Sequence, residues 1–172
     1  MNTMNKIARD SLMTLEAYAK NRKEFRAKVL AHKKNRIVHL GGHVTLIFED
    51  ELDAYNPLIP DGRNFKATML IEYEDVEERK AALAQMKGIE DKVWVRVEGL
   101  ARVYAIADED LERENDVKTS SVHFLRFELS KEMADALKYG MALAIGVDHP
   151  AYTATVDPLP AEIRSALVKD LD

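Results

Sequence analysis

The sequence contains no cysteine among its 172 residues, and only one tryptophan. Without cysteine the chain forms no disulfide, thiolate nucleophile, cysteine-ligated zinc site or protein-ligated iron–sulfur cluster. Long hydrophobic runs are absent too, because the longest apolar stretch, residues 141–147, is far too short to span a bilayer. Residues 1–10 have no apolar centre, so we expect no signal peptide, no membrane insertion and a cytoplasmic location.

Charge and hydrophobicity are those of an ordinary globular domain. The 25 Lys and Arg residues face 30 Asp and Glu, which gives a net charge of −5, and 47% of the residues are hydrophobic. A chain of this length buries enough surface for one core. We predict a single domain over residues 1–172, with a helical N-terminal region at 1–36, a sheet core at 37–157 and a C-terminal tail helix at 158–172.

The hydrophobic pattern changes between strand and helix along the chain. Residues 93–97 show the strand pattern most clearly, since valines alternate with Trp94 and Arg96 at a period of two. Strands are predicted at residues 36–40, 43–49, 65–73, 93–97, 101–107, 120–129 and, as the last one, 142–149. Helices are predicted around residues 12–19, 25–32, 76–87, 131–139 and 161–171, the third with Asp75 and Glu78 as a capping box.

These elements predict the fold class α+β. Several connections have hairpin length, so we expect a curled, largely antiparallel sheet or partly open barrel of about six strands, with N-terminal helices and two or three further helices. One sheet is expected to contain residues 65–73, 93–97, 101–107, 120–129 and 142–149. Its buried side chains are expected to include Ile71, Val95, Phe127 and Ile145.

No catalytic motif stands out in the sequence. It has no glycine-rich phosphate loop, no G-x-S-x-G elbow, no H-E-x-x-H pair and no EF-hand loop. Nothing therefore indicates phosphate binding or a serine hydrolase, and we favour a protein that is not an enzyme.

Two histidines, His123 and His149, lie on the apolar faces of their predicted strands. A buried imidazole needs hydrogen-bond partners, and two interpretations follow. In the first, which we favour, each is a core histidine bonded to its neighbours. In the second, the pair binds a divalent metal (Fe, Mn or Zn), with Glu72 or Asp148 as the carboxylate ligand.

His39 and His43 flank a two-residue turn at residues 41–42, so they can approach each other across a hairpin. With Glu49 or Glu51 they offer nitrogen and oxygen ligands for iron, manganese or zinc. No third ligand follows at a defined spacing, so we favour the interpretation that they are exposed turn histidines.

A basic run precedes the first predicted strand. Between residues 20 and 36, eight Lys and Arg side chains face a single glutamate. A solvated helix face is the simplest interpretation, and a docking surface for a protein partner is the second. The negative net charge and the acidic stretches 49–53, 72–78 and 108–116 argue against a nucleic-acid partner. The candidate binding residues of this region and the following turn are His32, Lys33, Lys34, Arg36 and His43.

Five segments together resemble a known family: residues 25–36 (FRAKVLAHKKNR), 51–64 (ELDAYNPLIPDGRN), 104–112 (YAIADEDLE), 119–129 (TSSVHFLRFEL) and 144–152 (AIGVDHPAY). They are similar to the bacterial family called domain of unknown function 3501, and the resemblance covers nearly the whole chain. Members of that family are often encoded beside a rubrerythrin-like protein and an iron–sulfur oxidoreductase of the glycerol-3-phosphate dehydrogenase C-subunit type. The resemblance implies a link to redox or peroxide metabolism but no catalytic residue. Its matches favour His32, His43, His123 and His149 over His39.

Two functions stay open. The favoured one is an accessory or binding protein that serves a redox or peroxide-stress system through protein–protein interaction, with a rubrerythrin-like protein and an iron–sulfur oxidoreductase as partners. The alternative is a metal-binding protein or metal-dependent enzyme that uses buried histidine and carboxylate ligands. The sequence also leaves homo-oligomerisation open.

The junction between Asp50 and Glu51 is abrupt. Residues 44–50 have the pattern of a strand, and a loop follows with no Gly, Pro, Asn or Ser at the junction to close the strand. In the family that the chain resembles, a polar helical segment lies between these two parts. Either the protein has lost this segment or the printed sequence lacks it, and we favour the second. The Cα atoms of Asp50 and Glu51 are then much further apart than the usual distance of about 3.8 Å.

Overall fold

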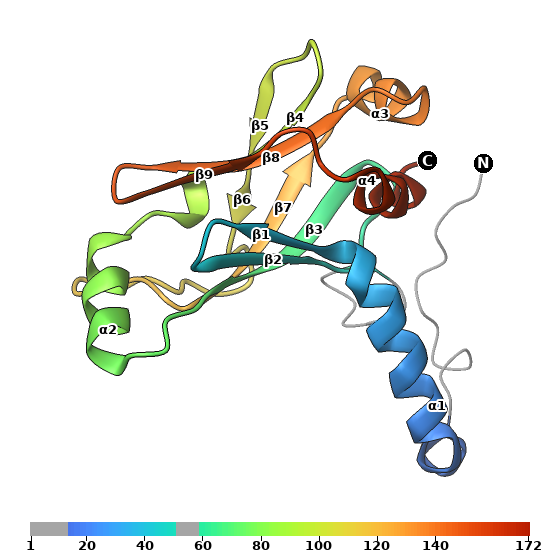
Figure 1. Ribbon diagram of the computed structural model, residues 1–172, viewed down its shortest axis with the longest axis horizontal. Coiled ribbons are helices and arrows are strands. Elements are labelled where there is room, and N and C mark those ends of the chain that lie inside the picture. Colours follow the sequence, from blue (N-terminus) through green and yellow to red (C-terminus); the bar gives the residue numbers. More distant parts are fainter. Residues whose placement is uncertain (1–13, 51–58) are drawn as a thin grey trace.

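The structure is a computed structural model that describes residues 14–50 and 59–172. Within these ranges it contains four α-helices and nine strands in two antiparallel sheets (Figure 1), so the predicted α+β class is confirmed. The strands are β1 (Ile37–Leu40), β2 (Val44–Phe48), β3 (Asn64–Ile71), β4 (Val93–Val97), β5 (Arg102–Tyr104), β6 (Ile106–Ala107), β7 (Val122–Glu128), β8 (Leu143–His149) and β9 (Tyr152–Val156). The α-helices are α1 (Leu15–Lys33), α2 (Val76–Gln85), α3 (Lys131–Lys138) and α4 (Ala161–Leu167), and short 3-10 helices are η2 (Lys34–Arg36), η4 (Glu90–Lys92) and η5 (Val168–Asp170).

The strands are divided between two sheets, which corrects the expectation of a single one. The first sheet has the order β1-β2-β3-β7-β6 and the second the order β5-β4-β8-β9. The two sheets meet in the segment that contains β5 and β6, because the Ala105 N–H still donates to Val93 O at 2.8 Å while the Asp108 N–H donates to Phe124 O at 2.8 Å. One extended segment therefore pairs first with β4 and then with β7, and it bends the strands into a curled, open arrangement.

The open side of this arrangement is bridged by a tyrosine. The Tyr152 hydroxyl, at the start of β9, donates to Leu40 O at the end of β1 and accepts the backbone N–H of His43. Strand β9 lies beyond the last predicted strand, which ends at residue 149. Pro150 occupies the turn of the β8–β9 hairpin, where no backbone N–H is required of it.

The core lies between the inner faces of the two sheets. Ile71, Val95, Phe127 and Ile145 are all at most 2% exposed, as the alternation predicted. Helix α2 begins at the expected cap, because the Asp75 carboxylate accepts the backbone N–H groups of Glu77 and Glu78. Within the described residues the Glu78 half of the predicted capping box does not form, and α1 begins after Thr14. The two helical patterns expected before residue 33 form one continuous helix, α1.

Helix α1 projects away from the strands in Figure 1, and most of its described side chains are exposed. No helix of the described residues is long and apolar enough to cross a membrane. Glu51 lies outside the described residues, so the expectation about the Asp50–Glu51 junction stays a prediction.

Candidate functional site

His123 lies at the centre of a buried polar cluster. It lies on strand β7, opposite Met69 of strand β3, and shares the inward face of β7 with Leu125 and Phe127. The side chain has no exposed surface. A buried imidazole at this position must find its hydrogen-bond partners within the protein.

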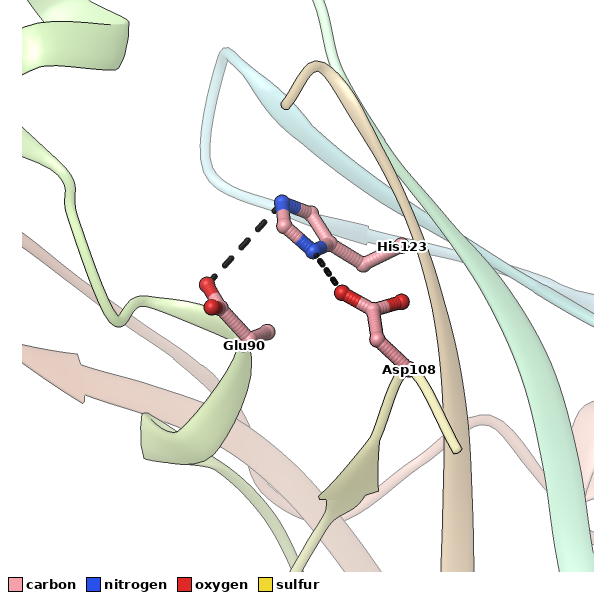
Figure 2. Close-up of side chains that lie close together, drawn as sticks. All are labelled: Glu90, Asp108 and His123. Carbon is pink, nitrogen blue, oxygen red and sulfur yellow. Dashed lines mark hydrogen bonds and ion pairs between the residues drawn. The ribbon is translucent and has the colours of Figure 1, made fainter. Parts of the chain in front are cut away.

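Both ring nitrogens of His123 have partners within the protein (Figure 2). The Nδ1 atom lies 2.6 Å from Asp108 Oδ2. The Nε2 atom lies 3.0 Å from Thr119 Oγ1, 3.1 Å from Ser120 O and 3.9 Å from Glu90 Oε2. The imidazole therefore has a carboxylate on one side and three different oxygen atoms on the other.

Asp108 is positioned by its own backbone and by two donors. Its φ of +49° places it in the left-handed region, which Asp tolerates better than most residues. Its Oδ1 atom accepts the Phe124 N–H at 2.9 Å and the Arg113 guanidinium at 3.1 Å. A carboxylate can only accept, so the hydrogen of the short contact sits on Nδ1 of His123.

Glu90 approaches the other side of His123 from η4. The residue is 9% exposed, and its carboxylate accepts one hydrogen bond from a side chain, the Thr119 hydroxyl at 3.4 Å. Burial raises the pKa of Glu90, and the neighbouring Glu114 and Asp91 act in the same direction; a backbone hydrogen bond and His123 oppose them. Of the two carboxylates in the cluster, Glu90 therefore has the negative charge that is less well stabilised by its neighbours.

Glu90, Asp108 and His123 are the one group of possible metal ligands in the described ranges, with ligand atoms within 4.8 Å of one another. Because Asp108 holds the Nδ1 hydrogen, Nε2 is the nitrogen that can face a cation together with Glu90. Without a cation, Nε2 can carry a second hydrogen and donate it to Ser120 O, which makes the cluster a buried ion-pair network.

The other predicted metal ligands lie elsewhere and do not join this group. His149 donates from Nε2 to Lys87 O at 2.9 Å and accepts the Ala151 N–H on Nδ1 at 3.1 Å, so it is a core histidine with both nitrogens in use. Asp148 pairs with Arg102, whose guanidinium lies 4.0 Å from the centre of the Trp94 ring. The structure thus places His149 and Asp148 in structural contacts.

Glu72 and His43 border a hollow of about 790 Å³ at the tip of the β1–β2 hairpin. The His43 ring stacks on Tyr73 with centroids 3.8 Å apart, and its Nδ1 lies 3.0 Å from Glu72 O. Glu72 accepts the Thr45 hydroxyl at 2.9 Å, and His39 contacts the same hydroxyl at 3.1 Å. We call Glu72, Glu74 and Glu78, which line this space with His43, Tyr73 and the single basic residue Arg79, the acidic hollow.

The predicted binding residues before β1 have different surroundings. Arg36 is 1% exposed, and its guanidinium donates to Phe48 O, Glu49 O, Ala166 O and the Asp170 carboxylate. It therefore holds the C-terminal segment against β2 and is not available to a partner. His32 is bonded to Asp50, Lys33 is half-buried, and Lys34 is exposed.

Sequence reasoning identified His123 but missed Glu90 and Asp108. Asp108 stands at the start of the acidic stretch 108–116, where the sequence signals only negative charge, and Glu90 follows the end of α2. Neither has a fixed spacing to His123, because the three residues come from three separate elements. In the sequence, only the position of His123 on the apolar face of its predicted strand points to this cluster.

Comparison with known proteins adds a family and a structural relative. The family described as Protein of unknown function (DUF3501) matches residues 6–52 and 49–171, two segments that overlap at the Asp50–Glu51 junction. A crystal structure of a novel protein of unknown function from Burkholderia pseudomallei K96243 is 49% identical, with a TM-score of 0.86, over 98% of this chain and 100% of the other. No curated protein matches the chain.

Proposed function

Since the chain belongs to the DUF3501 family of proteins of unknown function, we propose a function from its own buried site: His123 and Glu90 bind a divalent metal ion. We further propose that the protein acts as an accessory protein of a redox or peroxide-stress system. No reaction is proposed for it. The metal proposal rests on geometry, and the redox proposal rests on the family resemblance.

The observation that carries the metal proposal is the position of the Glu90 carboxylate. It is nine-tenths buried, its one side-chain hydrogen bond is long at 3.4 Å, and it lies 3.9 Å from the Nε2 atom of His123. A buried carboxylate with so little compensation is costly unless a positive charge stands beside it. A cation with bonds of about 2.1 Å to each atom fits within this separation.

Asp108 would act on the metal through His123. Its carboxylate holds the Nδ1 hydrogen at 2.6 Å, which fixes the ring and leaves Nε2 as the ligand atom. Thr119 Oγ1 and Ser120 O, both near Nε2, add oxygen donors. One imidazole with carboxylate, hydroxyl and carbonyl oxygens suits Mn²⁺, Fe²⁺ or Zn²⁺.

Metal analysis of the purified, untagged protein tests this proposal. We expect one equivalent of manganese, iron or zinc per chain, and calorimetric titration of the metal-free protein with Mn²⁺ or Zn²⁺ should give one site. Glu90→Gln keeps the size of the side chain and should weaken binding by about 10- to 100-fold, and Asp108→Asn should have an effect of similar size. His149→Gln is the matched control, because His149 is also buried but bonds only to backbone groups.

Circular dichroism must show that each variant is folded. A wild-type protein that is folded, holds no metal and binds none on titration would contradict the proposal, and the cluster would then be a structural ion-pair network. Equal loss of metal from the His149 and Glu90 variants would also contradict it, since the site would then not be the one described.

The redox proposal is supported by the resemblance to a family whose members are often encoded beside a rubrerythrin-like protein and an iron–sulfur oxidoreductase. Purified samples of a rubrerythrin-like protein and of an iron–sulfur oxidoreductase from the same organism should bind the chain in surface plasmon resonance. An unrelated acidic protein of similar charge is the control. Absence of binding to both candidate partners would refute the proposed link.

A further inference from the structure

One face of helix α1 carries an unusual combination of exposed side chains. Lys23, Arg26 and Leu30 of α1 and Lys34, the first residue of η2, follow one another at spacings of three or four residues, so they form a stripe along one side. All four are exposed, and Leu30 is 67% exposed. We call these four residues the basic stripe.

The charged side chains of the basic stripe are available to bind a partner. Within the described ranges, the side chains of Lys23, Arg26 and Lys34 make no hydrogen bond or ion pair. Between residues 20 and 34 the chain has seven Lys and Arg against one glutamate, Glu24. Acidic residues of this segment therefore neutralise little of its positive charge.

The acidic hollow is complementary to the basic stripe in two respects. Glu74 and Glu78 are exposed and, among the described residues, form no hydrogen bond or ion pair through their carboxylates. Between them in the sequence Val76, the first residue of α2, is 48% exposed and offers an apolar contact next to the hollow, although it does not line the hollow itself. Leu30 between basic side chains thus has a counterpart in Val76 between acidic ones.

The basic stripe and the acidic hollow lie at opposite ends of the same hairpin. Helix α1 leads through η2 into β1, and His43, just after the β1–β2 turn, stacks on Tyr73 ahead of α2. Figure 1 shows α1 and α2 beyond the two ends of this hairpin. A two-fold axis across the hairpin would bring α1 of each copy toward the acidic hollow of the other, so that the same contact would form twice.

We propose that a second copy of this chain is the occupant of the acidic hollow, and that the basic stripe of each copy docks there. Arg26 and its basic neighbours pair with Glu74 and Glu78, and Leu30 packs against Val76. A nucleic acid would satisfy the charge of the stripe but would leave Leu30 without an apolar partner. The inference is independent of the metal proposal, because none of its residues belongs to the His123 cluster.

Sedimentation velocity of the full chain across a range of concentrations tests this dimer. We expect a monomer–dimer equilibrium that weakens as salt rises from about 0.05 to 0.5 M, since exposed charge pairs are screened. Arg26→Glu and Glu78→Arg should each raise the dissociation constant at least about tenfold, which corresponds to about 1.4 kcal/mol. The two changes in one chain should restore dimerisation, because each reversed charge meets its reversed partner in the other copy.

Glu112→Arg is the matched control, because Glu112 is exposed and lies outside the acidic hollow. It should leave the dissociation constant unchanged. A chain that is monomeric at every concentration and salt would overturn the proposal, as would a dimer that Arg26→Glu and Glu78→Arg do not weaken. Failure of the double variant to regain dimerisation, with its fold intact by circular dichroism, would also overturn the pairing. A monomer that binds a heparin column through the basic stripe would instead assign the stripe to an anionic partner.

Discussion

Replacing Asp170 by Asn should remove a pH dependence from the stability of this protein. Asp170 lies in η5, is 6% exposed and pairs with the buried Arg36 guanidinium. Burial raises the pKa of Asp170 to about 6, and the nearby Asp50 acts in the same direction, although Arg36 and His32 oppose both. The carboxyl group therefore changes charge near neutral pH while it is packed inside the fold.

The direction of the effect follows from the two pKa values. In the unfolded chain the pKa of Asp170 is near its ordinary value of 3.8, so the folded protein binds the proton more tightly. Protonation of this group favours the fold, and its contribution is fully present below pH 3.8 and is lost as the pH rises through about 6. The full contribution is about 3 kcal/mol, and about 1.4 kcal/mol of it appears between pH 7.5 and pH 5.

Urea unfolding followed by circular dichroism at these two pH values measures the effect. The free energy of unfolding of the wild type, minus that of Asp170→Asn, should rise by about 1.4 kcal/mol as the pH falls from 7.5 to 5. Asn keeps the shape of the side chain and an oxygen that accepts from Arg36. Asp116→Asn, at an exposed position, is the control and should follow the wild type at both pH values.

A difference between wild type and Asp170→Asn that is the same at both pH values would refute this reasoning. A difference that falls as the pH falls would refute it more strongly. In that case Arg36 holds Asp170 ionised across the range, and the charge pairing outweighs the cost of burial.

Two further predictions concern the outer face of the second sheet, where Trp94 packs on Gly146. Gly146→Ala should lower the free energy of unfolding, measured in urea, by about 1–3 kcal/mol, because the added Cβ atom would lie 2.4 Å from Trp94 Cζ2. Gly42→Ala is the control and should change this free energy little, because its added Cβ atom would have no neighbour within 4 Å. Arg102→Met should shift the fluorescence emission of Trp94, the one tryptophan of the sequence, to longer wavelength, because the Arg102 guanidinium no longer covers the ring. The free energy of unfolding should change by less than about 1 kcal/mol, since the Arg102–Asp148 pair is partly exposed. Unchanged emission, or equal effects of the two glycine variants, would contradict these predictions.

Local sequence patterns determined most of the elements. Alternation of valine with Trp94 and Arg96 predicted β4 at its observed bounds, because successive side chains of a strand point to opposite faces. Asp75 predicted the start of α2, since a carboxylate at that position satisfies backbone N–H groups that no helical carbonyl reaches. The same alternation placed His123 on the buried face.

Pairing between distant segments was decided only by the tertiary structure. The pattern of residues 101–107 predicts one strand, but its two halves pair with different neighbours, β4 and β7, and so divide the strands between two sheets. Strand β9 follows a proline, and it is stabilised by its ladder with β8. A periodic pattern indicates which face of a strand is buried, but it does not indicate which strand lies beside it.

The surroundings of the buried polar side chains were likewise decided by the tertiary structure. His123 meets Glu90 and Asp108, whereas His149 meets backbone groups of Lys87 and Ala151, although both histidines have the same strand parity. Arg36, the last residue of a basic run, is buried because the C-terminal segment returns to it with Asp170. The sequence by itself determined which side chains turn inward, since that depends on local periodicity. Which partners they meet depends on where the chain crosses itself, because a buried polar group must bond to whatever segment the fold brings beside it.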